Sequence, residues 1–180
     1  FRSNKCRNSN YWMAQKHHWS FPMEIVLWNK RTYNRYANGT VSKLAKDVSS
    51  VSKDISEQIR SFFDFITDFK PGTAEYKNIT SKMINEFFNL SMNLDKQEYN
   101  KFLNKSIDTI DSYGLGIALM YMLNQSKHLL DRDFSTRAFL LFKNMVHPNV
   151  YSRNDTDVLM NEYEDLLSEQ GLLKKHNMRF

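Results

Sequence analysis

Apolar residues fill nearly every position between Asp111 and Leu123, in the stretch Asp-Ser-Tyr-Gly-Leu-Gly-Ile-Ala-Leu-Met-Tyr-Met-Leu. This pattern predicts a helix that is buried on all sides. An acid and two glycines, Gly114 and Gly116, lie near its start. Because each glycine costs a helix about 1 kcal/mol relative to alanine, we expect a structural reason for them, such as the close approach of another backbone.

A second apolar pattern covers the range Val41–Phe65, at alternating three- and four-residue steps, with polar Gln58 at one step. This heptad-like spacing predicts an amphipathic helix that begins after the turn signal Asn38-Gly39 and ends at residues 70–73. The apolar positions are Val41, Leu44, Val48, Val51, Ile55, Phe62 and Phe65.

Two more helices are predicted in the same region. The first covers residues 74–93, and a capping box with Asp95 as the cap opens a short helix that runs through Leu103. Three helices with apolar stripes and short links favour a small bundle or hairpin over roughly residues 38–105. The apolar side of the helix at 74–93 consists of Ile79, Met83, Ile84, Phe87, Phe88 and Leu90.

The last third of the chain alternates between loops and helices. We expect a loop over 124–128, an aromatic-rich helix over 134–145, and a last helix that is capped by Asn154 or Asp155 and stopped by Gly171. The predicted buried face of the last helix consists of Val158, Leu159, Tyr163, Leu166 and Leu167.

The composition is typical of one globular, mostly helical domain. The 180 residues are 41% hydrophobic and 25% charged, with only 5 Gly and 3 Pro. A single cysteine, Cys6, excludes an internal disulfide and favours a reducing compartment. No run of 18 apolar residues occurs and residues 1–20 are polar and basic, so we expect no transmembrane helix and no signal peptide.

Positive charge is concentrated near the N-terminus. Residues 1–53 contain ten Lys and Arg against only Glu24 and Asp47, within a net charge of +5. Such a surface could bind the phosphates of a nucleic acid or of a phosphorylated segment. A solvated basic surface is the simpler interpretation, because no nucleic-acid-binding motif accompanies the charge, and we do not expect a nucleic-acid partner.

Three short motifs, in order along the chain, resemble parts of the eukaryotic-type protein kinase domain. Asp111-Ser-Tyr-Gly-Leu-Gly116 resembles the D-x-[WY]-[SG]-x-G pattern that opens the central F helix. Ser20-Phe-Pro-Met-Glu24 looks like the A-P-E motif that closes the activation segment, in a P-x-E variant. Pro148-Asn-Val-Tyr-Ser-Arg153 looks like the late-lobe pattern P-x-x-x-x-R. The combination is most similar to serine/threonine kinases, and in particular to the divergent kinases of large DNA viruses.

The resemblance implies a role for each motif residue. It pairs Glu24 with Arg153, a task that suits the planar, bidentate fork of an arginine. It gives Asp111 the role of accepting hydrogen bonds from the backbone of the catalytic loop, and it makes Gly116 part of the F-helix motif. The alternative for Asp111 is an acid favoured by the dipole at a helix N-terminus.

The resemblance also implies a substrate pocket and a packed core between the two lobes of a kinase. The pocket would be shaped by residues near the P-x-E motif, and Met122 with its apolar neighbours would anchor the side-chain columns that join the lobes. The substrate-pocket candidates are Trp19, Ser20, Phe21 and Pro22.

The implied fold class is mostly α: the helical C-terminal lobe of a protein kinase-like fold, with a helical insertion between the A-P-E-like motif and the F helix. The expected parts are residues 1–28 as activation segment and P-x-E motif, 38–105 as insertion, 106–171 from F helix to terminal helix, and 172–180 as a basic tail.

Other kinase motifs are not found in the chain, which starts at Phe1: the Gly-rich loop, the V-A-I-K lysine, the H-R-D-x-x-x-x-N loop and D-F-G. These parts bind ATP and metal and position the substrate hydroxyl. We therefore interpret the chain as a fragment that is inactive alone, with no catalytic, cofactor-binding or metal-binding residue. ATP and Mg²⁺ are implied for the parent, which would transfer the γ-phosphate of ATP to protein hydroxyls.

The expected partners follow from this interpretation. They are the missing N-terminal part of the kinase domain, a protein substrate and a protein that binds the helix at Val41–Phe65, with no membrane. Packing of that helix against its own neighbours explains the same pattern. The expected location is intracellular, in the cytoplasm of a host cell or in a virion if the protein is viral. The alternative function is a non-catalytic helical protein-interaction module.

Overall fold

The computed structural model describes residues 21–37 and 73–171, and the following account concerns these ranges. They are built from helices and contain no strand, which confirms the mostly α class. The expected helix at Val41–Phe65, the candidates Trp19 and Ser20, and the tail 172–180 lie outside the described residues. The elements are η1 (Met23–Leu27), α3 (Lys30–Ala37), α5 (Ala74–Met92), η2 (Lys96–Glu98), α6 (Tyr99–Asp108), α7 (Ile110–Ser126), α8 (Arg132–Met145), η3 (Val150–Ser152) and α9 (Thr156–Glu169), where η marks a 3₁₀ helix.

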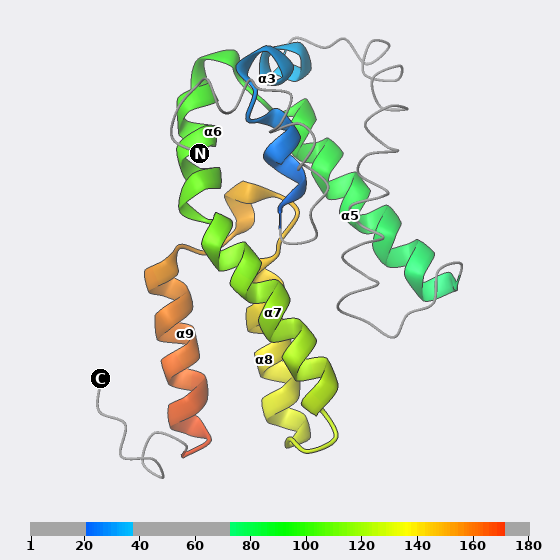
Figure 1. Cartoon of the computed structure of the whole chain (residues 1–180), viewed down its shortest axis with the longest axis vertical. Coiled ribbons are helices and arrows are strands. Elements are labelled where there is room, and N and C mark those ends of the chain that lie inside the picture. Colours follow the sequence, from blue (N-terminus) through cyan, green and yellow to red (C-terminus); the bar gives the residue numbers. More distant parts are fainter. Residues whose placement is uncertain (1–20, 38–72, 172–180) are drawn as a thin grey trace.

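The described helices form two groups, which are connected by the contact between α6 and α7. Figure 1 shows η1, α3, α5 and α6 in the upper half of the view, and α7, α8 and α9 in the lower half. The helix α8 packs against both α7 and α9. The segment with η3 returns from the end of α8 toward α6, so the C-terminal part of the chain contacts the N-terminal group.

Gly116 allows α7 and α8 to approach closely. A Cβ atom at this position would lie 2.7 Å from Cβ of Met145 and 2.9 Å from Cγ1 of Val146. Both distances are shorter than a normal carbon–carbon contact, so a larger residue would force the helices apart. Close packing against α8 is therefore the reason for this glycine in the helix.

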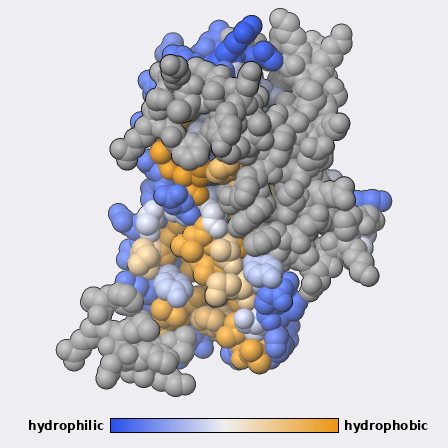
Figure 2. Space-filling model, viewed as in Figure 1, coloured by the Kyte–Doolittle hydropathy of each residue, from blue (hydrophilic) through white to orange (hydrophobic). Residues whose placement is uncertain are grey.

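The prediction that the helix after Asp111 is buried on all sides is wrong for the described structure. Tyr113, Ile117 and Leu123 are buried, but Leu115 is 54% exposed and Met122 is 61% exposed. Figure 2 shows apolar side chains gathered on the surface in the lower half of the view, where α7 lies in Figure 1. An apolar run predicts complete burial only if other chain covers every side of the helix, and α8 packs on only one side of α7.

The segment between η1 and α5 contains a helix that the sequence pattern did not predict. In α3, Asn29 acts as the cap, since its side-chain oxygen accepts hydrogen bonds from the backbone N–H groups of Arg31 and Thr32. Tyr33 and Tyr36 are buried on one side of this short helix. Three-residue spacing of two tyrosines is too short a pattern to predict a helix reliably.

Two helix ends differ from the expected positions. The helix α6 extends to Asp108, across the expected boundary at residue 105, and it buries Phe102 and Leu103. The last predicted helix of the insertion is therefore part of the core. The helix α7 continues to Ser126, where a loop from Asn124 was expected.

The predictions for α5 and α8 are close to the observed helices. Phe87 and Leu90 are buried on α5. The helix α8 begins two residues before the predicted start, because the carboxylate of Asp131 accepts hydrogen bonds from the backbone N–H groups of Asp133 and Phe134.

The last helix is confirmed in extent but not in its whole buried face. Leu159 and Leu166 are buried, whereas Val158 and Tyr163 are 45% and 39% exposed. The side chain of Asp155, at the N-cap position, makes no capping hydrogen bond and instead accepts one from Lys105. Gly171 follows the helix with a φ angle of +68°, which confirms it as the C-terminal stop.

Candidate functional site

A buried ion pair joins two segments that are far apart in the sequence. Nη1 of Arg153 lies 2.6 Å from Oε1 of Glu24, and Nη2 lies 2.8 Å from Oε2. Glu24 is 0% exposed and Arg153 is 3% exposed. The predicted contact between these residues is therefore present, and its two parallel bonds fix orientation as well as distance.

Local backbone structure places each partner. Pro22 is buried and adopts an extended conformation before η1, so that Glu24 lies in the first turn of this 3₁₀ helix. On the other side, the Asn149 side chain accepts a hydrogen bond from the backbone N–H of Tyr151 and starts η3. Arg153 follows η3 with extended backbone, which directs the chain away before α9 begins.

The remaining polar atoms of the arginine also have partners. Its Nε–H donates to the backbone oxygen of His147 at 2.8 Å, and Nη1 lies 3.5 Å from Oγ1 of Thr109. The Thr109 hydroxyl donates to the backbone oxygen of Lys105, one turn earlier in α6. A buried guanidinium is tolerated because its donors are used in this way.

The glutamate belongs to a second chain of hydrogen bonds. The Ser106 hydroxyl donates to Oε1 of Glu24 at 3.1 Å and accepts a 2.7 Å bond from Nε1 of Trp28. The Tyr99 hydroxyl donates to the backbone oxygen of Trp28. Two turns of α6 are thereby connected to η1 and the residue after it through buried polar groups.

An aromatic ring on α7 completes the surroundings of the pair. The guanidinium carbon of Arg153 lies 4.7 Å from the centre of the Tyr113 ring, within the range of a cation–π interaction. Burial raises the pKa of the Tyr113 hydroxyl well above its ordinary value, although the arginine charge opposes the shift. The pair therefore connects η1, α6, α7 and the η3 segment. Its described contacts hold these elements together inside the core.

Asp111 lies beside a separate cavity, in the first turn of α7. Its side chain is exposed, and the cavity has a volume of about 290 Å³. The lining residues are Phe21, Trp28, Ile107, Ile110, Asp111, Gly114 and Leu115. The role of Asp111 as an acceptor of hydrogen bonds from a catalytic loop stays a prediction.

The two motif glycines have different surroundings. Gly116 packs against α8, while Gly114 borders the cavity beside Asp111. Of the substrate-pocket candidates within the described residues, Phe21 lines the same cavity and Pro22 is buried next to η1.

Sequence reasoning missed the polar residues that surround the ion pair. Ser106 and Thr109 are three residues apart, so both face the same side at the end of α6 and its C-cap. Two small hydroxyl residues close to the apolar Phe102 and Leu103 could have predicted a buried polar contact at this end of α6, because buried hydroxyl groups need hydrogen-bond partners. The partners themselves, Trp28 and Arg153, could not be identified from spacing.

Within residues 21–37 and 73–171, no group of three or more His, Cys, Asp or Glu side chains is arranged to hold a metal ion. No helix in these ranges combines the length and the apolar character needed to cross a membrane.

No family model matches the chain, and no curated protein or solved structure is similar enough to count as a match.

Proposed function

We propose that this chain is the C-terminal-lobe part of a serine/threonine protein kinase domain. The observation that carries the proposal is the buried, bidentate Glu24–Arg153 pair. Two motifs that resemble kinase elements predicted this contact between residues 129 positions apart. A chance match of short motifs gives no reason for their charged residues to meet inside the core.

In this proposal the pair positions the end of the activation segment. It holds the P-x-E motif against α6 and α7, so that Phe21 and Pro22 help to shape the substrate pocket. The described residues provide positioning and packing, while ATP and Mg²⁺ are bound by other parts of the kinase domain. Bound together, they supply the γ-phosphoryl group and neutralise its charge.

The exposed side of α7 supports the same proposal. Asp111, Leu115 and Met122 are separated by four and seven residues, so they share one face of the helix. All three are exposed, and the cavity beside Asp111 lies at one end of this face. The catalytic-loop part of a kinase would cover the apolar positions and donate backbone hydrogen bonds to Asp111.

The proposal is tested on the natural full-length protein that contains this chain. We expect H-R-D-x-x-x-x-N and D-F-G motifs shortly before Phe1, and transfer of labelled γ-phosphate from ATP to a general protein substrate such as casein. In that protein, Asp111→Asn should lower kcat by about a hundredfold with little change in KM for ATP, because the catalytic loop loses its anchor.

Asp108→Asn is the matched control, since Asp108 is an exposed acid at the end of the preceding helix. It should retain the activity of the unchanged protein. The proposal fails if the natural reading frame starts with a Met codon directly before Phe1, if no phosphate is transferred, or if the two variants have equal activity.

A non-catalytic helical interaction module is the second candidate. Exposed apolar side chains on α7 and α8 favour it, including Leu115, Met122, Phe139 and Leu140. In such a module these residues would bind a partner protein rather than the rest of a kinase. A natural start codon directly before Phe1, together with a stable complex lost in Met122→Lys, would favour this function over the kinase.

A further inference from the structure

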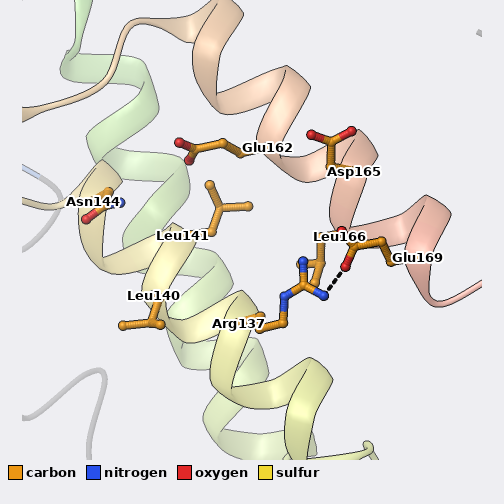
Figure 3. A pocket seen from close by; sticks show the side chains of 8 residues that line it. All are labelled: Arg137, Leu140, Leu141, Asn144, Glu162, Asp165, Leu166 and Glu169. Carbon is orange, nitrogen blue, oxygen red and sulfur yellow. Dashed lines mark hydrogen bonds and ion pairs between the residues drawn. The ribbon is translucent and has the colours of Figure 1, made fainter.

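A groove runs between α8 and α9, apart from the buried ion pair and from the cavity at the start of α7. It has a volume of about 350 Å³. Figure 3 shows that its side chains come from both helices, with Leu141 and Leu166 between them. The lining residues occupy positions 137–144 of α8 and 162–169 of α9. About two helical turns, or roughly 10 Å, therefore border the groove on each side.

The groove combines a buried apolar part with an exposed apolar edge. Leu141 and Leu166 are buried, whereas Leu140 is 52% exposed at the side of α8. Covering an exposed leucine with another apolar side chain is favourable, by about 25 cal/mol for each Å² removed from water. A ligand that places apolar side chains in the groove therefore gains contacts with leucines from both helices.

The charges in the groove are only partly balanced. Arg137 is the one base among the lining residues, and it forms an ion pair with Glu169, drawn as a dashed line in Figure 3. Glu162 accepts a hydrogen bond from Asn154, which is neutral. In the described part of the chain, neither Glu162 nor Asp165 forms an ion pair with a Lys or Arg. Two negative charges of the groove are therefore left without a counter-charge.

The rest of α9 strengthens this negative surface. No Lys or Arg occurs within Thr156–Glu169, and the last turn of the helix has no base to offset the negative end of its dipole. A ligand of this groove should therefore be positively charged as well as apolar. The five acids of α9 are Asp157, Glu162, Glu164, Asp165 and Glu169.

We propose that the α8–α9 groove binds a basic amphipathic helix of a partner protein. Two adjacent helices leave a furrow that a third helix can fill with apolar residues at three- and four-residue steps. Lys and Arg beside this apolar stripe then lie against Glu162 and Asp165. A strand is a poorer occupant, because α8 and α9 use their backbone groups within the helices and offer no sheet edge to pair with. This binding role does not depend on a kinase function.

Fluorescence anisotropy of the full 180-residue chain with a labelled synthetic peptide tests the proposal. The probe has about four helical turns, with Leu at three- and four-residue steps and Lys at the other positions. A second peptide carries Glu in place of each Lys, so it has the same apolar face and the opposite charge. The Lys peptide should bind at least about tenfold more tightly than the Glu peptide, and high salt should reduce this difference.

Substitution of acids shows where the Lys peptide binds. Glu162→Gln combined with Asp165→Asn removes both unbalanced charges of the groove and should weaken binding about tenfold. The matched control combines Asp157→Asn with Glu164→Gln, which removes two acids of the same helix that do not line the groove. This control should change the affinity by less than about twofold.

A second pair of variants tests the apolar contact. Leu140→Asn should weaken binding of the Lys peptide about fivefold, because the exposed edge loses its apolar surface. Leu129→Asn is the control, since Leu129 is exposed in the turn after α7 and does not line the groove. Glu162, Asp165 and Leu140 are all exposed, so their variants should keep the helical circular dichroism spectrum.

Equal affinities of the two peptides would overturn the proposal, and so would equal losses in the groove variants and their controls. Sedimentation of the chain tests a second copy as the occupant. Self-association that the groove variants remove, together with unchanged binding of the Lys peptide, would assign the groove to a second copy and overturn the proposal.

Discussion

At the scale of single residues, the buried Glu24–Arg153 pair should be highly sensitive to substitution. Both side chains are buried and make two direct bonds to each other. Such a pair adds little net stability compared with apolar residues of the same shape. The loss of one partner is nevertheless severe, because the other charge stays buried without compensation.

We expect Glu24→Gln to lower the free energy of unfolding by about 3–5 kcal/mol, because Arg153 then lacks its counter-charge. Urea unfolding followed by circular dichroism measures the change. The matched control is Glu98→Gln, which removes the exposed ion pair with Lys101 and should have little effect. Equal effects of the two variants would contradict the buried location of the pair.

Tyr33 predicts a dependence of stability on alkaline pH. Burial, and to a smaller extent Tyr151, Glu98 and Asp95, raise its pKa to about 12, and its hydroxyl donates to the backbone oxygen of Asp95. The unfolded chain ionises its tyrosines near pH 10. The folded state holds this proton more tightly, so the contribution is fully present below about pH 10 and is lost as the pH rises toward 12.

Replacement of Tyr33 by Phe should therefore make the stability curve flatter between about pH 10 and pH 12, because one raised pKa is removed. Urea midpoints at several pH values measure this slope. Tyr163→Phe changes an exposed tyrosine and should leave the slope as it was. A slope that Tyr33→Phe does not alter would show that another group controls alkaline unfolding.

At the scale of elements, the contact between α7 and α8 depends on one glycine. Any Cβ at position 116 would meet Met145 and Val146 at distances below 3 Å, and neither contact involves the far end of a flexible side chain. The usual advantage of alanine in a helix, about 1 kcal/mol over glycine, is therefore opposed by overlap between the helices.

We expect Gly116→Ala to destabilise the chain by about 1–3 kcal/mol despite the better helix propensity of alanine. Thermal unfolding measures the loss. Gln125→Ala is the control, because Gln125 is exposed on the same helix and reports propensity without the steric overlap. A stabilising effect of Gly116→Ala would mean that α7 and α8 can separate without loss of packing.

The helices also show which of their features can be predicted from the sequence and which cannot. The left-handed Gly171 is a local feature, so the sequence analysis recognised the helix end that it sets. The cap at Asp131 is also local, but the prediction followed the apolar pattern and started this helix two residues too late. The buried face of α9 was only partly predicted, because Val158 and Tyr163 are apolar but exposed. Burial depends on what packs against a helix, which its own sequence does not contain.

At the scale of the whole molecule, the exposed side of α7 provides a test of the proposed kinase domain. Met122→Lys places a charge at a position that is 61% exposed, so the chain alone should change in stability by no more than about 0.5 kcal/mol. In the full-length protein the same change should be clearly destabilising, because the proposed kinase covers this face.

The control for Met122→Lys is Leu129→Lys, in the turn after α7, where the side chain is 77% exposed. It should have little effect in either the chain or the full-length protein. Chemical unfolding of both proteins measures the difference. The same small effect of Met122→Lys in both would show that this face of α7 is not covered.

The sequence by itself determined the helical class, the extent of α5 and the stop at Gly171, because periodicity and capping are local properties of the chain. Motif resemblance also predicted that Glu24 meets Arg153. Only the tertiary structure decided that Ser106 and Trp28 extend the hydrogen-bond network of this ion pair, that Gly116 faces α8 and that one side of α7 is exposed. These features depend on which distant segments pack together, and that is settled by the shape and burial of whole surfaces rather than by spacing along the chain.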